Sequence, residues 1–210
     1  ISASSVTFAG NSIDSTLTVD AGAFNFNITA GTDIITTGSA LVCKNLDFTG
    51  FSGTFAKSAL PAYIFGDLTL SSGMTFTGFT SATTYLTVFA SPNSTQKITS
   101  NGKIFTTSTI WFGTNNTVAT GLNVLKPTFK LMDSFTLDSL SAAIYFSVGT
   151  LDLNNYTLTT PQFNTVSTQW TRYLIFGTSG QINLNSTATV LTTVWYCDNS
   201  VSIYGTPTVN

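Results

Sequence analysis

Histidine and glutamate are both absent from the 210-residue sequence, and cysteine occurs only twice. Without histidine the chain cannot build a Ser-His-Asp or Cys-His arrangement or a histidine-based metal site. It also lacks the phosphate-binding patterns GxxxxGK and GxGxxG. The sequence therefore excludes most catalytic designs, and we expect a protein that is not an enzyme and that holds no cofactor and no metal.

Charge is equally scarce. Charged residues make up 8% of the chain, against the ~25% of an ordinary globular protein. Nine Asp face six Lys and Arg172, so the net charge is -2 and no basic patch exists to bind nucleic acid. No apolar run reaches the ~20 residues of a membrane span, so we expect no membrane insertion. Both ends of the sequence begin or stop in mid-pattern, which predicts a fragment or a processed chain.

The two cysteines, Cys43 and Cys197, stand in the apolar contexts LVCKNL and VWYCDN. Two cysteines are too few for the disulfide framework of a small secreted fold. We expect buried thiols that act as small hydrophobic side chains, with no bond between them.

Apolar and hydroxyl side chains are what the sequence has in quantity. It is 42% hydrophobic, with 17 Phe, so it can bury a sizeable core and is not disordered. Ser and Thr dominate the polar positions, and Thr suits pleated surfaces. Long helices draw on Glu, Lys and Arg, so this composition predicts an all-β fold.

The clearest pattern is GTLDLNNYTLTTPQFN, residues 149–164. Apolar and polar residues alternate on both sides of Asn154-Asn155, which predicts two short strands with one buried face, joined by a tight corner. Asn suits such a corner because it tolerates left-handed backbone angles.

Degraded copies of this strand-corner-strand pattern occur at residues 34–42, 97–107 and 181–187. Repetition of one unit is the signature of a stacked array. The sequence therefore predicts a parallel β-solenoid (β-helix) built from short repeats, in one domain over 1–210. Approximate modules are 17–84, 85–150 and 151–210. The alternative is an antiparallel β-sandwich, which also has short strands and frequent turns. Residues 51–65 and 124–132 fit the pattern poorly, and we expect an excursion and an edge or corner insertion there.

Paired aspartates are the one catalytic design left open. Asp133 with Asp138, or Asp152 with an Asp of a neighbouring coil, could supply the two carboxylates of a glycoside hydrolase. The alternative is that these are solvated corner residues, as turn chemistry favours.

Tryptophans are candidates for sugar or partner contact. Trp111, Trp170 and Trp195 occur in WFG, QWTRY and VWYCD, and Trp170 alternates with Arg172. A ring beside a guanidinium would form a platform for a saccharide or a partner. The alternative for all three rings is packing in the core or at the end of the stack.

The segments GTLDLNNYTLTTPQFNT, TRYLIFGTSGQINLN, KITSNGKIF and YGTPTVN resemble Thr/Asn-rich repeat modules of tailed-bacteriophage structural proteins, especially tail fibres and spikes. The resemblance implies a non-enzymatic shaft or decoration in a virion or outside the cell. It would be homo-oligomeric, with a trimer favoured, or bound to other virion proteins, and would present a surface to host glycans. Alternatives are a bacterial cell-surface adhesin or extracellular filament subunit, and a polysaccharide depolymerase that uses an Asp pair.

Overall fold

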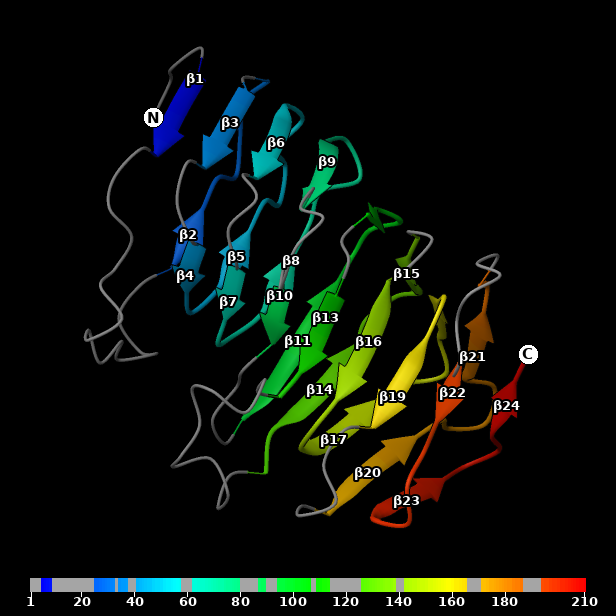
Figure 1. The fold of residues 1–210 in the computed structure, drawn as a ribbon. Coiled ribbons are helices and arrows are strands. Elements are labelled where there is room, and N and C mark those ends of the chain that lie inside the picture. The colour runs from blue at the N-terminus through cyan, green and yellow to red at the C-terminus, as the bar shows by residue number, and fades with distance from the viewer. Residues whose placement is uncertain are drawn as a thin grey trace.

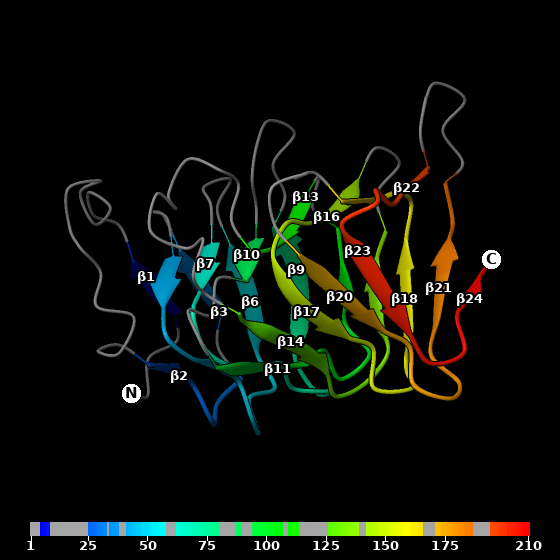
Figure 2. The same cartoon turned by 90° about the horizontal axis from the view of Figure 1, so that it is seen from below.

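The computed structural model describes residues 5–8, 25–32, 34–37, 41–57, 62–79, 87–89, 94–106, 109–113, 126–138, 142–165, 171–186 and 194–210. Every regular element in these ranges is a β-strand, from β1 to β24. The strands form coils stacked along one axis, with β1 and β24 at opposite ends of the stack (Figures 1 and 2).

Each coil contributes one strand to each of three faces, in the order face 1, face 2, face 3. Face 1 is an eight-stranded sheet with the order β2 (Phe26–Asn27), β5 (Leu46–Asp47), β8 (Leu68–Thr69), β11 (Thr95–Thr99), β14 (Thr128–Leu131), β17 (Gly149–Asp152), β20 (Arg172–Ile175), β23 (Val201–Tyr204).

Face 2 consists of a four-stranded sheet followed by a five-stranded one. The ring of Phe76 in β9 contacts that of Phe105 in β12 at 5.0 Å, so the second sheet continues the first. The first is β1 (Ser5–Phe8), β3 (Ile34–Thr37), β6 (Thr54–Lys57), β9 (Thr75–Phe79). The second is β12 (Ile104–Phe105), β15 (Phe135–Leu137), β18 (Thr157–Thr160), β21 (Gln181–Leu184), β24 (Thr208–Val209).

Face 3 is a seven-stranded sheet whose central strands lie side by side in Figure 1. Its order is β4 (Leu41–Cys43), β7 (Ala62–Ile64), β10 (Thr87–Phe89), β13 (Thr109–Phe112), β16 (Ala143–Phe146), β19 (Phe163–Thr165), β22 (Trp195–Tyr196).

Every strand pairing among the described residues is parallel, and each strand pairs with the equivalent strand of the next coil. The parallel β-solenoid is thus confirmed, and the antiparallel sandwich does not form. Equivalent positions in successive coils are separated by 19 residues at the least, as for Tyr145 and Asn164, and by 34 at the most, as for Trp111 and Tyr145. The structural repeat is therefore a single coil, and the division into three modules stays a prediction.

Alternation sends one side chain of each strand inward and the next outward, as in β17, where Leu151 is buried and Asp152 is not. The inward side chains form one continuous core along the axis. Phenylalanine rings connect successive coils, with centroid separations of 4.8 Å for Phe48 and Phe55 and 4.6 Å for Phe105 and Phe135. Burial of these rings is the main stabilising term, at about 1.5–3 kcal/mol each.

Corners between face 1 and face 2 use residues with left-handed backbone angles, as predicted. Asn101, Asn154 and Asn155 all have positive φ, at 49°, 50° and 68°. Gly177 takes the same role in the next coil, with φ of 74°. Asn is suited to these corners because its short amide hydrogen-bonds nearby backbone.

Two segments that fit the repeating sequence pattern poorly nevertheless contribute strands to the stack of coils. The segment 124–132 is not an edge or a corner insertion, because β14 lies between β11 and β17 in the middle of face 1, with Phe129 and Leu131 buried. Within 51–65, strands β6 and β7 also take their places in the stack. The cysteines lie at opposite ends of face 3, Cys43 in β4 and Cys197 just after β22, and both are free thiols.

Candidate functional site

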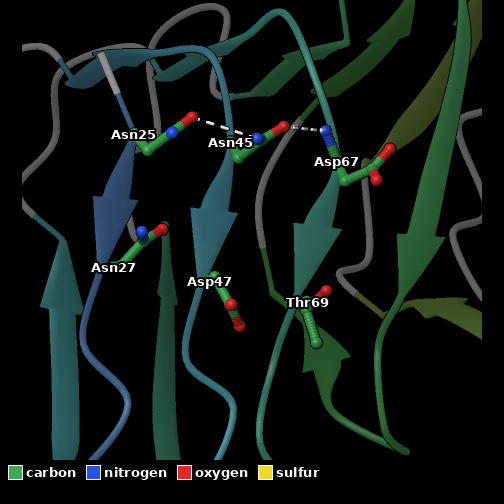
Figure 3. Close-up of a pocket in the computed structure, with 6 residues that line it drawn as sticks. All are labelled: Asn25, Asn27, Asn45, Asp47, Asp67 and Thr69. Carbon is green, nitrogen blue, oxygen red and sulfur yellow. Dashed lines mark hydrogen bonds between the residues drawn. The ribbon is translucent and has the colours of Figure 1, made fainter.

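The first three coils carry a shallow depression on the outer surface of face 1. Six side chains line its volume of about 210 Å³, in two rows that run across β2, β5 and β8 (Figure 3). One row is Asn25, Asn45, Asp67 and the other is Asn27, Asp47, Thr69.

The first row is a hydrogen-bonded ladder between coils. Asn45 donates to the side chain of Asn25 at 3.0 Å and accepts from the backbone N–H of Asp67 at 2.7 Å. Asp67 in turn accepts from the N–H of Lys97 at 2.8 Å. The ladder therefore links four successive coils and orients the polar groups of the depression.

Free acceptors remain in this depression. Asp47 uses one oxygen to accept from the N–H and hydroxyl of Thr49, at 2.8 and 2.6 Å. Among the described residues, its other oxygen, the second oxygen of Asp67 and the amide of Asn27 have no hydrogen-bond partner. Such groups can bind hydroxyls. Within the described residues, no cluster of three or more His, Cys, Asp or Glu is placed to hold a metal ion.

The aspartates singled out in the sequence have contacts of their own, and a catalytic pair among them stays a prediction. Asp133 accepts from the N–H groups of Ser100, at 2.8 Å, and Asn101, so it stabilises the corner of the preceding coil. Asp152 accepts from the N–H of Asn154 at 2.8 Å and lies 3.5 Å from the ammonium of Lys130. Asp138 is exposed at the end of β15. Asp133 and Asp152 therefore have structural roles.

Trp111 lies on the outer surface of face 3. Its ring stacks on Tyr145 of the next coil, with 4.6 Å between centroids and 21° between planes. The indole N–H is buried and has no hydrogen-bond partner. One ring face of Trp111 is therefore covered by Tyr145, and sugar contact at Trp111 stays a prediction.

Trp195 occupies an inward position. It pairs in register with Phe163, and the two rings stack at 5.2 Å. This ring packs against the core, which is the alternative that the sequence left open. Trp170 lies outside the described residues.

Arg172 is fully buried, with an exposed fraction of 0%. Its guanidinium contacts both carboxylate oxygens of Asp198 at 2.6 Å, donates to the carbonyl oxygen of Phe146 at 3.4 Å, and also contacts the hydroxyl of Ser200. These partners belong to the coils before and after β20, so Arg172 fastens three coils together and is not available as a surface platform.

The same cluster sets the pKa of the carboxylate. Burial raises the pKa of Asp198, but hydrogen bonds from Ser200 and Arg172 and the guanidinium charge outweigh it, so the pKa lies below its ordinary value. The carboxylate is thus held in its charged form.

Sequence reasoning missed the residues of the depression and the tyrosines of face 3. Asn25, Asn45 and Asp67 each stand directly before an inward apolar residue of a face 1 strand, which is a weak signal in a chain so rich in Asn and Thr.

Searches with the sequence and the structure find no match among protein-family models, curated proteins or solved structures. Within the described residues, no helix has the length and apolar character needed to cross a membrane.

Proposed function

We propose that the chain is a structural, non-enzymatic β-solenoid module of a virion, in a tail fibre, spike or capsid decoration, where it provides a rigid shaft. The observation that carries this proposal is the unbroken parallel stack of face 1, with eight strands over one continuous core. Virion context is supported by the resemblance of the Thr/Asn-rich segments to phage fibre and spike modules.

Side-chain bonds between coils support a load-bearing role. Polar links run from Asn45 to Asn25 and Asp67, from Asp133 to the corner at Ser100, and from Arg172 to Asp198. Hydroxyl and amide ladders also avoid the repulsion that stacked like charges would suffer. These links oppose the separation of neighbouring coils within the stack.

Protease resistance tests the shaft. The intact chain should survive proteinase K at physiological temperature, whereas Phe135→Ala, which removes a ring packed on Phe105, should be digested faster because the cavity costs about 3–5 kcal/mol. Thr136→Ala, on the outward side of the same strand, is the matched control and should resemble the wild type. Rapid loss of the whole wild-type chain would contradict the proposal.

Immunogold labelling separates the virion from the alternative of a bacterial adhesin or filament subunit. Antibodies raised against the chain should decorate purified phage particles and leave the surface of uninfected host cells unlabelled. Labelling of uninfected cells alone would support the adhesin instead.

A depolymerase is the second candidate, because Asp47 and Asp67 line one depression. They lie diagonally on adjacent coils, since Asp47 pairs in register with Thr69. Coil and strand spacings put their Cα atoms about 8 Å apart, and inverting glycosidases hold their carboxyl groups ~6.5–9.5 Å apart. New reducing ends from host capsular polysaccharide, lost in Asp47→Asn and Asp67→Asn but kept in Asp138→Asn, would establish this activity and overturn the non-enzymatic proposal.

A further inference from the structure

The outward positions of face 3 form a row in register along the sheet. In its last four strands the row is Trp111, Tyr145, Asn164, Tyr196. We call the last three of these residues the face 3 notch, because the shorter Asn164 lies between two tyrosines in the row.

Face 3 carries no charged residue in any of its seven described strands. Face 1 differs sharply, because its outward row includes Asp67, Lys97, Lys130 and Asp152. The only arginine, Arg172, is buried in its ion pair. A charged ligand would therefore find no countercharge on the described strands of face 3, which favours a neutral one.

Spacing along the row determines what the notch can hold. Adjacent coils are about 4.8 Å apart. Aromatic rings on neighbouring coils therefore stack directly and leave no gap, as Trp111 and Tyr145 do with 4.6 Å between their ring centroids. Tyr145 and Tyr196 are two coils apart, or about 9.6 Å. One ring in contact with both faces needs about 7–8 Å, so the gap above Asn164 accepts a single ring with a modest tilt of the tyrosines.

The notch is also open and polar at its base. Tyr196 is 48% exposed. Among the described residues, the Asn164 amide makes one long contact, 3.5 Å to the side-chain oxygen of Gln162, so both amides keep donors and acceptors for a ligand.

We propose that the face 3 notch of Tyr145, Asn164 and Tyr196 binds one sugar ring of a neutral glycan chain. A pyranose offers apolar C–H faces to the two tyrosine rings and hydroxyls to the amides of Asn164 and Gln162. An aromatic side chain of a protein partner would cover these amides without offering them hydrogen bonds, which disfavours it relative to a sugar. This inference goes beyond the proposed shaft and names a ligand class for the glycan-presenting surface that the resemblance implies, but it does not depend on the shaft or virion assignments.

Affinity electrophoresis of the full chain tests the proposal. Native gels contain either a neutral polysaccharide (mixed-linkage β-glucan, galactomannan or dextran) or an acidic one (polygalacturonate or alginate). We expect retardation by at least one neutral polysaccharide and none by the acidic ones. Tyr196→Ala and Asn164→Ala should each weaken the binding about tenfold, equal to ~1.4 kcal/mol.

Tyr204→Ala is the matched control, because Tyr204 is 52% exposed but belongs to face 1. It should bind as the wild type does, and urea unfolding should show that all three variants are folded. Absence of retardation in all neutral gels overturns the proposal, as does retardation in acidic gels alone or an equal loss in Tyr204→Ala. Protease resistance and immunogold labelling are unaffected by any of these results, so this inference can fail while the proposed function stands.

Discussion

Asn155 shows how much one corner residue contributes. Its side-chain oxygen accepts from the N–H and hydroxyl of Thr178, at 2.7 and 3.1 Å, and from the N–H of Ser179 at 3.3 Å, all in the next coil. Its own backbone has a φ of 68°. One residue therefore provides both the turn of one coil and the attachment of the next.

Asn155→Ala should destabilise the chain by about 0.5–1.5 kcal/mol, because the Thr178 and Ser179 donors lose their partner, with a further loss because alanine is disfavoured at positive φ. Asn155→Gly removes the same hydrogen bonds but tolerates the backbone angle. Urea unfolding should give a loss for Gly that is smaller by about 1 kcal/mol. Equal losses in the two variants would show that backbone strain is negligible here.

Thiol chemistry distinguishes the two cysteines. Burial raises the pKa of Cys43 to about 12, and its side chain is almost completely enclosed. Burial also raises the pKa of Cys197, with a further increase from Asp198 that Arg172 opposes, but this thiol is only half-buried.

Iodoacetamide at mildly alkaline pH should therefore modify Cys197 slowly and leave Cys43 unmodified until the chain unfolds, because the thiolate is the reactive form. Peptide mass spectrometry with and without denaturant measures both sites. Modification of Cys43 in the native protein at the rate of Cys197 would contradict its enclosed position.

At the scale of the element, the strand β20 depends on the ion pair of Arg172 with Asp198. Removing one partner of a buried pair leaves an uncompensated charge, whereas replacing both is often neutral. Asp198→Ala should cost about 3–5 kcal/mol, and the double variant Arg172→Met/Asp198→Ala should recover most of it. Urea unfolding followed by tryptophan fluorescence measures the three proteins, and a double variant no better than the single one would argue against this account.

Acid should weaken the same contact. The folded pKa of Asp198 lies below the ordinary 3.8, so the contribution of the pair is complete above that value and is lost as the pH falls through the folded pKa. The stability difference between wild type and Asp198→Asn should therefore be largest near neutrality and shrink between about pH 5 and pH 2. Thermal melting across this range provides the measurement, and a difference that grows on acidification would show the opposite sign.

Elements differ in how far the sequence predicts them. The strands around Asn154-Asn155 follow from alternation and corner chemistry alone. Arg172, Leu174 and Phe176 stand at alternate positions, so the alternation of a strand places all three side chains inward. The charge of Arg172, however, favours an exposed side chain when the sequence is interpreted alone. The face 3 notch could not be predicted, because Tyr145, Asn164 and Tyr196 align only when the register between coils of unequal length is known.

For the whole molecule, stability is shared between neighbours, because each coil contacts only the coils before and after it. At the C-terminal end of the stack, the last strand of each face, β22, β23 or β24, is paired on one edge only within the described residues. Ile203 and Val209 continue inward rows of the core, yet they are 43% exposed.

Amide hydrogen exchange should be slow in the middle of the stack and faster toward its C-terminal end. Protection should be greatest in the central strands β14 and β17 and lowest in β23 and β24, because opening at an end breaks contacts on one side only. Mass spectrometry of exchanged peptides measures it. Uniform protection along the axis would indicate that another chain covers the last coil.

The connections between faces differ in length. Every corner from face 1 to face 2 is short, whereas segments that enter or leave face 3 vary from residues 161–162, between β18 and β19, to residues 113–127, between β13 and β14. Differences in length between coils therefore fall at the corners that border face 3, whereas the corners from face 1 to face 2 stay short. A foreign peptide grafted within 113–127 should be displayed there while the rise per coil is preserved, so the molecule can diversify what it presents without changing its reach.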